Sequence, residues 1–357
     1  MERYSLRKAD LNRWIDSMID RCQVFVPSRI EEEIFFSPVD EAPEMDLLGG
    51  TAVLPYLPPK DIVFPQSEIL FSYSGKGEET KVEVPEGPKR GLVILGIRSC
   101  DTQGIFWLDQ FFQENFNDFY YSRRRNKVTL VTIACNQPAK NCFCICCQGG
   151  PFLGSESQNF DIQLISFQDG YLVECNSTQG KELIDMRPDI FFPPEAGMEE
   201  IRFHLEEESQ KKFLPAPTSY MSTAIRRITS NGIPPELWTE LGERCFDDGG
   251  CSFVCPCCSC FGVGYLANDG KGYHYRYWDS CGYAGFTREV SGHNPREEKG
   301  ERFKRRFFHK LSYQYLKKDG RIGCVGCGRC ITACPGEVTM PLVVERIRKA
   351  QEAKYFK

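Results

Sequence analysis

The residues best suited to carry chemistry lie in the segment 324–335, where four cysteines stand at the spacing C-x2-C-x2-C-x3-C and a proline follows the last. Thiolates this close together can bind several irons of one cubane cluster, and the spacing is typical of [4Fe–4S] ferredoxins. A zinc site usually combines two C-x2-C pairs and needs neither the third spacing nor the proline. In proteins with two clusters, the fourth cysteine of such a motif binds the other cluster, so a second motif is expected. The four cysteines are Cys324, Cys327, Cys330 and Cys334.

The segment 245–256 fits the same template, with Cys245, Cys251 and Cys255 in place but Asp248 at the second ligand position. Three interpretations stay open: Asp248 binds iron through oxygen, the position is empty and gives a [3Fe–4S] centre, or a cysteine from 257–260 replaces it. A carboxylate is a harder ligand than a thiolate and would change the cluster's potential. Crossed ligation predicts two [4Fe–4S] clusters. Cluster one takes Cys245, Cys251, Cys334 and the uncertain ligand, and cluster two takes Cys255, Cys324, Cys327 and Cys330.

A third group of cysteines follows two apolar runs of strand length, 91–97 and 128–134. If these strands are parallel neighbours, Cys100 and Cys135 emerge at the same carboxyl edge, which is where α/β sheets place ligands. Cys142 and Cys144 follow in a loop, so four thiols can converge on a third cluster. The alternative is that they are buried structural cysteines.

A looser group consists of Cys258, Cys260 and Cys281. These three either complete the irregular cluster, bind another metal or line the redox path, and the sequence does not choose between these roles.

Composition limits the class of protein. The chain has 357 residues, a net charge of −5 and 19 cysteines, and its first residues contain no apolar signal segment. No run of 18 apolar residues is present, so we expect a cytoplasmic chain that neither inserts in a membrane nor binds nucleic acid. Thiols stay reduced in the cytoplasm, which makes metal ligation a better explanation of the cysteines than disulfides.

The apolar patterns predict two domains. Residues 1–220 are expected to form an α/β or α+β domain with a mixed sheet and the extra cluster site, because strand, helix and strand alternate around 91–134. Residues 221–357 are expected to form an α-helical, ferredoxin-like domain that carries both [4Fe–4S] motifs. The basic run 302–310 is interpreted as a solvated face or as a docking surface for an acidic partner.

Several segments together resemble one family of iron–sulfur subunits, which is shared by anaerobic sulfite reductases and by cytoplasmic nickel–iron hydrogenases, where it is the beta subunit. The resemblance covers most of the chain from about residue 90 onward. It rests on R-S-C-D at 98–101, Y-Y-S-R-R at 120–124, Cys135 with N-C-F-C at 141–144, the cysteines and proline of 251–258, W-D-S-C at 278–281, G-H-N-P-R at 292–296, and 324–335.

This resemblance implies an electron-transfer role beside a protein that binds FAD and NAD(P), with electrons passing to or from a catalytic or bifurcating subunit. FAD is then expected in the partner. The resemblance also implies a domain like the α-helical ferredoxins and supports a third cluster. The family normally has a cysteine where this chain has Asp248, and a threonine where it has Cys257.

We therefore expect an electron-transfer subunit of a multi-subunit oxidoreductase, without a substrate site of its own. Two alternatives are a reductase whose substrate reacts at the cluster near Asp248, and a redox or iron sensor with a labile cluster. The cysteine density exceeds what one site needs, and no acid–base set is visible, which favours the first.

Overall fold

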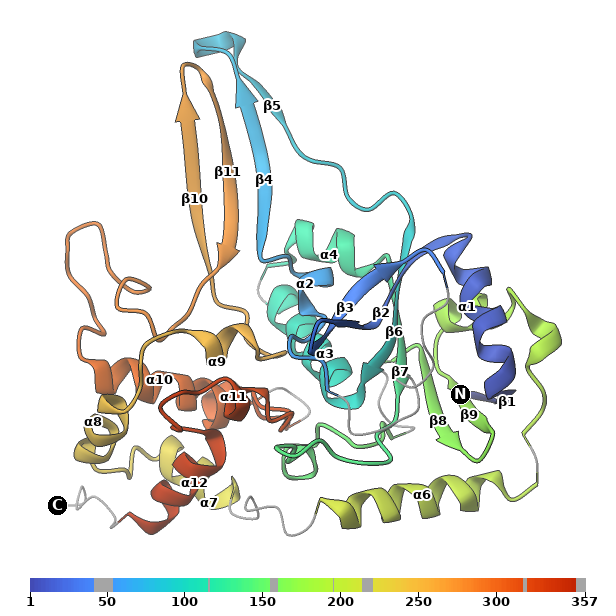
Figure 1. Cartoon of the computed structure of the whole chain (residues 1–357). Helices are drawn as coiled ribbons and strands as arrows, with labels where there is room; N and C mark the ends of the chain where they lie inside the picture. The colour runs from blue at the N-terminus through green and yellow to red at the C-terminus, as the bar shows by residue number, and fades with distance from the viewer. Residues whose placement is uncertain are drawn as a thin grey trace.

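The computed structural model describes residues 1–41, 54–114, 116–154, 160–194, 196–213, 221–316 and 320–350. A seven-stranded mixed sheet forms the N-terminal part, with the strand order β1-β9-β8-β7-β6-β2-β3 (Figure 1). The central strands β2, β6, β7 and β8 are parallel, and the outer pairs are antiparallel. The strands are β1 (Glu2–Arg7), β2 (Cys22–Ile30), β3 (Glu33–Val39), β6 (Gly91–Arg98), β7 (Val128–Ile133), β8 (Ile162–Phe167) and β9 (Gly170–Cys175).

Helices cover both faces of this sheet, as continuous apolar strands require. On one face, α1 (Leu11–Ile19) and α5 (Thr178–Ile184) bury side chains such as Trp14 and Leu183 against Val93 and Val131. On the other, α3 (Ser99–Gln113) and α4 (Phe119–Arg125) pack on the alternate residues of β6 and β7. The predicted strands 91–97 and 128–134 are confirmed as the parallel neighbours β6 and β7.

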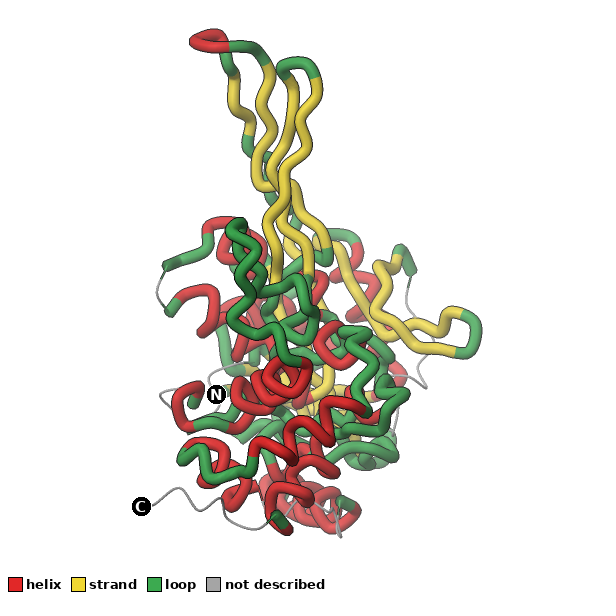
Figure 2. Tube along the Cα trace, turned by 90° about the vertical axis from the view of Figure 1, so that its left-hand side faces the viewer, coloured by secondary structure: helices red, strands yellow, loops and turns green. Residues whose placement is uncertain are grey.

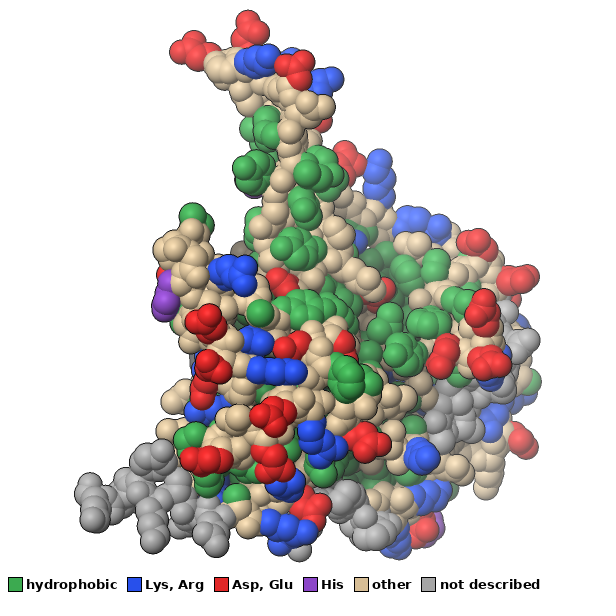
Figure 3. Space-filling model, turned by 60° about the vertical axis from the view of Figure 1, so that its left-hand side comes forward, with side chains coloured by type: hydrophobic (Ala, Val, Ile, Leu, Met, Phe, Trp, Pro, Cys, Tyr) green, Lys and Arg blue, Asp and Glu red, His purple; other side chains and the backbone are tan. Residues whose placement is uncertain are grey.

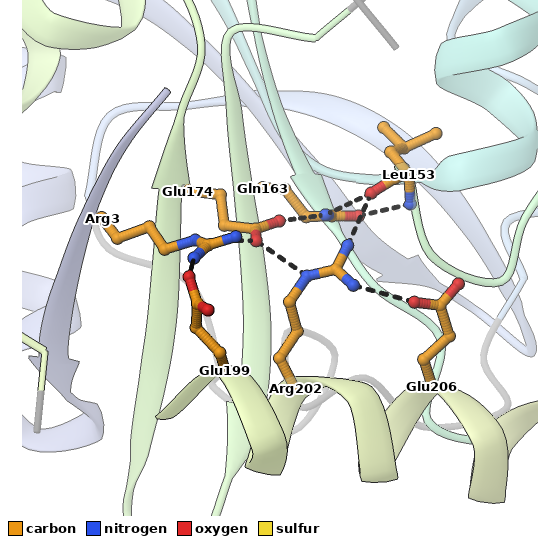
Figure 4. A network of polar contacts seen from close by, with 7 residues as sticks. All are labelled: Arg3, Leu153, Gln163, Glu174, Glu199, Arg202 and Glu206. Atoms are coloured by element: carbon orange, nitrogen blue, oxygen red, sulfur yellow. Dashed lines mark hydrogen bonds and ion pairs between the residues drawn. The ribbon is translucent and has the colours of Figure 1, made fainter. Parts of the chain in front are cut away.

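A buried ionic network holds α6 (Met198–Lys212) against the edge of the sheet (Figure 4). Glu174 of β9 is fully buried and accepts hydrogen bonds of 2.7 Å from Arg202 and of 2.7 Å from Gln163. Arg3 of β1 lies 3.4 Å from the same carboxylate. A buried carboxylate is costly unless it is paired, so these contacts fix the helix to β8, β9 and β1.

A four-stranded antiparallel sheet projects from the body, and we call it the arm (Figures 1 and 2). It consists of β4 (Ser67–Ser74), β5 (Lys81–Glu83), β10 (Phe261–Asn268) and β11 (Lys271–Trp278), in the order β10-β11-β4-β5. The arm therefore joins strands from both predicted domains. Exposed apolar side chains, among them Val263, Tyr265 and Leu266, lie along it (Figure 3).

The remaining C-terminal residues form short helices around a separate apolar core. Phe303 and Phe307 of α10 pack there with Trp238 of α8. The mixed sheet followed by a helical, ferredoxin-like region agrees with the predicted fold class. The helices are α7 (Met221–Thr229), α8 (Pro235–Glu243), α9 (Gly250–Phe253), α10 (Lys299–Leu311), α11 (Arg329–Thr332) and α12 (Met340–Lys349).

Within the region expected to be α-helical, residues 261–278 differ from the prediction. They form the hairpin β10–β11, whose turn contains Asp269 and Gly270 with φ values of 40° and 75°. An Asp-Gly pair at positive φ is a strong signal for a two-residue hairpin turn. The predicted domain boundary at residue 220 lies outside the described residues. No helix within the described ranges combines the length and apolar character needed to cross a membrane.

Candidate iron–sulfur centres

The two cysteine motifs share one local structure. Each is a loop in which a glycine with positive φ precedes a one-turn helix: Gly249 (φ 70°) before α9, and Gly328 (φ 79°) before α11. Only glycine adopts this conformation freely, so it lets the loop turn back while the cysteines face one side. The two short helices contact each other. The motifs therefore lie side by side although about 80 residues separate them along the chain.

Cysteines of both motifs line the first cavity. Cys245 and Cys251 come from the first motif and Cys334 from the second. Cys281 and Cys330 reach the same cavity. The structure thus brings together the residues that crossed ligation assigns to cluster one.

Asp248 lies at the open side of this cavity, and its side chain is exposed. Its Oδ1 accepts a 2.8 Å hydrogen bond from the backbone N–H of Gly250, and Tyr283 donates to its backbone carbonyl over 2.9 Å. The loop is therefore ordered by its own contacts, while one carboxylate oxygen stays available. An iron held there by oxygen would be exposed to solvent and to other ligands.

The second group comprises Cys255 with Cys324, Cys327 and Cys330. Lys310 of α10 is buried and donates to Cys255 Sγ over 3.2 Å. Hydrogen bonds from the thiols of Cys257 and Cys258, aided by the ammonium of Lys310, hold the pKa of Cys255 well below its usual value although burial opposes this. Burial raises the pKa of Cys330 to about 11, and the thiolates of Cys324 and Cys255 contribute to that shift.

The expectation that the basic run 302–310 forms a solvated or docking face was wrong at two positions. Arg302 and Lys310 are buried, with exposed fractions of 6% and 4%. Arg302 forms a 3.1 Å ion pair with Asp247 of the first motif, and Lys310 points at Cys255. Both cations therefore offset negative charge at the cysteine motifs, because a buried charge must be paired.

Cys100, Cys135, Cys142 and Cys144 line one further cavity. Cys100 lies in the first turn of α3 directly after β6, and Cys135 follows β7, so parallel pairing brings them to one edge of the sheet. Burial raises the pKa of all four thiols, in the case of Cys142 to about 11. Desolvated thiols of this kind are inert unless a metal ion stabilises their thiolates.

This N-terminal cavity abuts the second motif. The N–H of Phe143 donates to Gly326 O over 2.8 Å, and Cys142 Sγ lies 3.6 Å from Cys327 O. A Cβ added at Gly326 would lie 2.5 Å from Phe143 O, and one added at Gly328 would lie 2.3 Å from Asn141 O. The two loops therefore touch backbone to backbone, and the glycines are needed for this approach as well as for their positive φ.

A buried ion pair ties the same two segments together. Arg329 of α11 donates to both oxygens of Asp101, which follows Cys100, and Arg329 Nη2 lies 2.7 Å from Asp101 Oδ2. Both side chains are almost completely buried. Arg329 also donates to Pro55 O over 2.7 Å. The pair was not predicted from the sequence, because its members are 228 positions apart and the cysteine spacing says nothing about the role of Arg329 within the second motif.

Cys258 and Cys260 do not line the first cavity but a second one, at the base of the arm. Cys281 lines both cavities. A hydrogen bond from the thiol of Cys281 lowers the pKa of Cys260 to about 7. The structure thus brings these three predicted metal candidates together, and of the three only Cys281 also lines the cavity that contains Asp248.

Within the described ranges, no three His, Cys, Asp or Glu side chains are arranged to hold a single metal ion. A cubane cluster makes a different demand, since each cysteine binds its own iron at a corner of the cube. For the second group, the C-x2-C-x2-C-x3-C-P spacing fits such a cluster better than it fits zinc.

Comparison with known proteins agrees with this geometry. Residues 244–338 match the family model of the 4Fe-4S dicluster domain. The chain thus resembles this domain family over the region that carries both cysteine motifs. Over 330 residues it is also 29% identical to the sulfhydrogenase 2 subunit beta of Pyrococcus furiosus, with 92% of each chain covered.

The dicluster domain includes both cysteine motifs and ends just after Pro335. Its binding of [4Fe–4S] clusters follows from the match, and the resemblance to a hydrogenase beta subunit expected from the sequence is confirmed. The similarity to the relative covers far more of the chain than residues 244–338, so it extends into the N-terminal part.

Proposed function

We propose that this chain is the electron-transfer subunit of a cytoplasmic oxidoreductase complex, and that it conducts electrons through a row of three [4Fe–4S] clusters. Cluster one is assigned to Cys245, Cys251 and Cys334 with Asp248, and cluster two to Cys255, Cys324, Cys327 and Cys330. The third cluster is assigned to Cys100, Cys135, Cys142 and Cys144. When bound, each cluster supplies one-electron chemistry, and the protein adjusts its potential by charge, hydrogen bonds and burial.

The observation that carries the proposal is the contiguity of the three cysteine groups. The Asn141–Cys144 loop touches Gly326 and Gly328 of the second motif, and Cys334 of the second motif lines the same cavity as Cys245 and Cys251 of the first. Electrons would thus pass from the proposed N-terminal domain (1–220) into the proposed C-terminal domain (221–357). A single catalytic site would not require three adjoining groups.

The partners are proposed from the resemblance. The similar protein is by its name one subunit of a sulfhydrogenase, so we propose that this chain also acts beside other subunits. One would bind FAD and NAD(P), and the other would be catalytic or bifurcating. The chain's own residues show no dinucleotide fingerprint, which supports a flavin held in the partner.

Electron paramagnetic resonance (EPR) of the fully reduced chain tests the row of clusters. Adjacent reduced clusters should broaden each other's signals by spin coupling. Replacing Cys327 with Ser should remove or alter cluster two and leave the N-terminal signal narrow, whereas Cys22→Ser should change nothing. Independent, unbroadened signals in the unmodified chain would contradict the proposal.

The partner is tested on the complex isolated anaerobically through a tag on this chain. NADH or NADPH should reduce the clusters of the complex, but should not reduce those of the isolated chain. Clusters in the complex that respond to dithionite and not to either nucleotide would refute a flavin and NAD(P) partner.

The exposed carboxylate of Asp248 favours one second candidate, a reductase whose substrate binds at the iron of cluster one. Cyanide is a suitable probe for such an open iron. A shift of the cluster-one signal with cyanide, absent in Asp248→Cys, would support this candidate. An unchanged signal would exclude it.

A further inference from the structure

Four cysteines that the three assigned clusters do not use surround one cavity at the base of the arm: Cys257, Cys258, Cys260 and Cys281. The hairpin explains how they meet. Cys260 directly precedes β10, and Cys281 follows shortly after β11, so the antiparallel pairing that begins at Phe261 and Trp278 brings them together. The N–H of Asp279 donates to Cys260 O over 3.0 Å, and the thiols of Cys260 and Cys281 are hydrogen-bonded.

The wall of this cavity suits an anionic group. The cavity encloses about 300 Å³. Its lining includes Arg306, His309 and Lys310 but no Asp or Glu. Lys60 of α2 (Lys60–Val63) is also buried nearby and donates to Cys258 O over 3.1 Å. Buried cations need a negative partner, and thiolates around an iron–sulfur core supply one.

The rest of the wall is largely aromatic, with Trp107, Phe111, Phe286 and Tyr315. Such a wall keeps water from most of the cavity, and a hydrophobic shell of this kind controls solvent access to a metal group. Phe111 is itself 45% exposed, so the cavity reaches the surface beside α3. A redox group here would lie near the surface, where a partner's redox centre can approach.

Three simpler explanations leave observations unaccounted for. Structural thiols are expected to fill space as small apolar groups, not to line a cavity together with the cationic side chains of Arg306 and Lys310. A zinc ion needs ligands that converge on one point, and within the described segments no such group occurs. A disulfide between Cys260 and Cys281 would use two thiols, but would not explain why Cys257 and Cys258 line the same cavity.

The geometry points to an additional [4Fe–4S] cluster at the base of the arm, held by Cys257, Cys258, Cys260 and Cys281. This inference rests on the proposed electron-transfer function for its role, because the cluster would adjoin the proposed path. Cys257 and Cys258 both contact Cys255 of cluster two, and Cys281 also lines the cavity of cluster one. Electrons would leave the row here for a partner bound beside Phe111.

The test is native mass spectrometry of the full chain, purified anaerobically, together with iron and sulfide analysis. The double variant Cys260→Ser/Cys281→Ser should lose one cubane, about four irons and about four sulfides per chain. The double variant Cys22→Ser/Cys175→Ser removes the same number of thiols away from the cavity and should keep the full complement. An unchanged iron content in the first variant would overturn the inference, and so would a Cys260–Cys281 disulfide in the iron-loaded chain.

Alkylation of the unmodified chain gives a second measurement that does not depend on how the variant folds. Cys260 and Cys281 should resist iodoacetamide while the clusters are bound and should react after chelation has removed the iron. Labelling before chelation would overturn the inference. The proposed function has its own control: Cys324→Ser should lose cluster two. If it does while Cys260→Ser/Cys281→Ser keeps all its iron, the inference alone fails.

Discussion

Replacing Lys310 with Met should lower the reduction potential of cluster two. The ammonium lies 3.2 Å from Cys255 Sγ and is buried. Although burial disfavours its charge, the thiolate of Cys255 raises the pKa of Lys310 well above its usual value, so it is a cation at neutral pH. A positive charge favours the reduced cluster, which carries one more electron.

The size of the effect follows from the distance. The added electron is spread over the cube, so we take an effective separation of about 6 Å and an effective dielectric constant of about 20, which gives about 3 kcal/mol. For a one-electron couple this corresponds to roughly 120 mV. Methionine is an unbranched, neutral replacement that fills nearly the same space, so packing should be retained.

The assay is a redox titration of the anaerobic chain followed by EPR. Lys304→Met is the matched control, because Lys304 lies on the same helix but its ammonium is 3.7 Å from Glu301, and the pair is partly exposed. We expect the potential of cluster two to fall by about 100 mV in Lys310→Met, whereas a surface pair is worth at most about 1 kcal/mol. A shift in Lys310→Met no larger than that in Lys304→Met would refute the assignment of Cys255 to cluster two.

Three further changes test other parts of the site. Asp248→Cys should abolish any oxidised [3Fe–4S] signal, since a thiolate retains the corner iron better than a carboxylate does; an unchanged EPR spectrum would speak against ligation at this position. Arg329→Met should leave the buried carboxylate of Asp101 unpaired and cost about 3–5 kcal/mol, seen as a lower midpoint of urea unfolding, and Asp101→Asn/Arg329→Met should recover part of that loss; equal midpoints for the unmodified chain and Arg329→Met would contradict this. Gly326→Ala should weaken cluster retention on heating far more than Gly320→Ala does. Both glycines have positive φ, but only at Gly326 would the added Cβ lie 2.5 Å from a backbone oxygen, that of Phe143. Similar losses of iron in the two variants would show that backbone strain alone matters.

Local spacing made much of the site predictable from the sequence. The C-x2-C-x2-C-x3-C-P motif indicates [4Fe–4S] binding from twelve consecutive residues. The same spacing, applied to the rest of the chain, identified the first motif although Asp248 replaces one of its cysteines. The meeting of Cys100 and Cys135 was predictable because two buried parallel strands end at a common edge. In these cases the relevant geometry follows from neighbours in sequence or from one βαβ unit.

Contacts between distant segments were not predictable in the same way. In the sequence, Lys310 is one residue of a basic run, and only the packing of α10 turns its ammonium toward Cys255. Asp101 and Arg329 lie in two separate sequence motifs, and nothing in either motif indicates that they pair, so the ion pair is visible only in the structure. The arm combines strands from the two predicted domains, although the Asp269-Gly270 turn was a local signal that was missed.

The most direct test of cluster-based electron transfer is iron and acid-labile sulfide per chain, measured on anaerobically purified protein together with EPR of its oxidised and reduced forms. We predict at least about twelve irons with matching sulfide, and spin-half signals of [4Fe–4S] clusters on reduction. Bound zinc without any iron–sulfur signal would contradict the assignment of every cysteine group and the electron-transfer function with it.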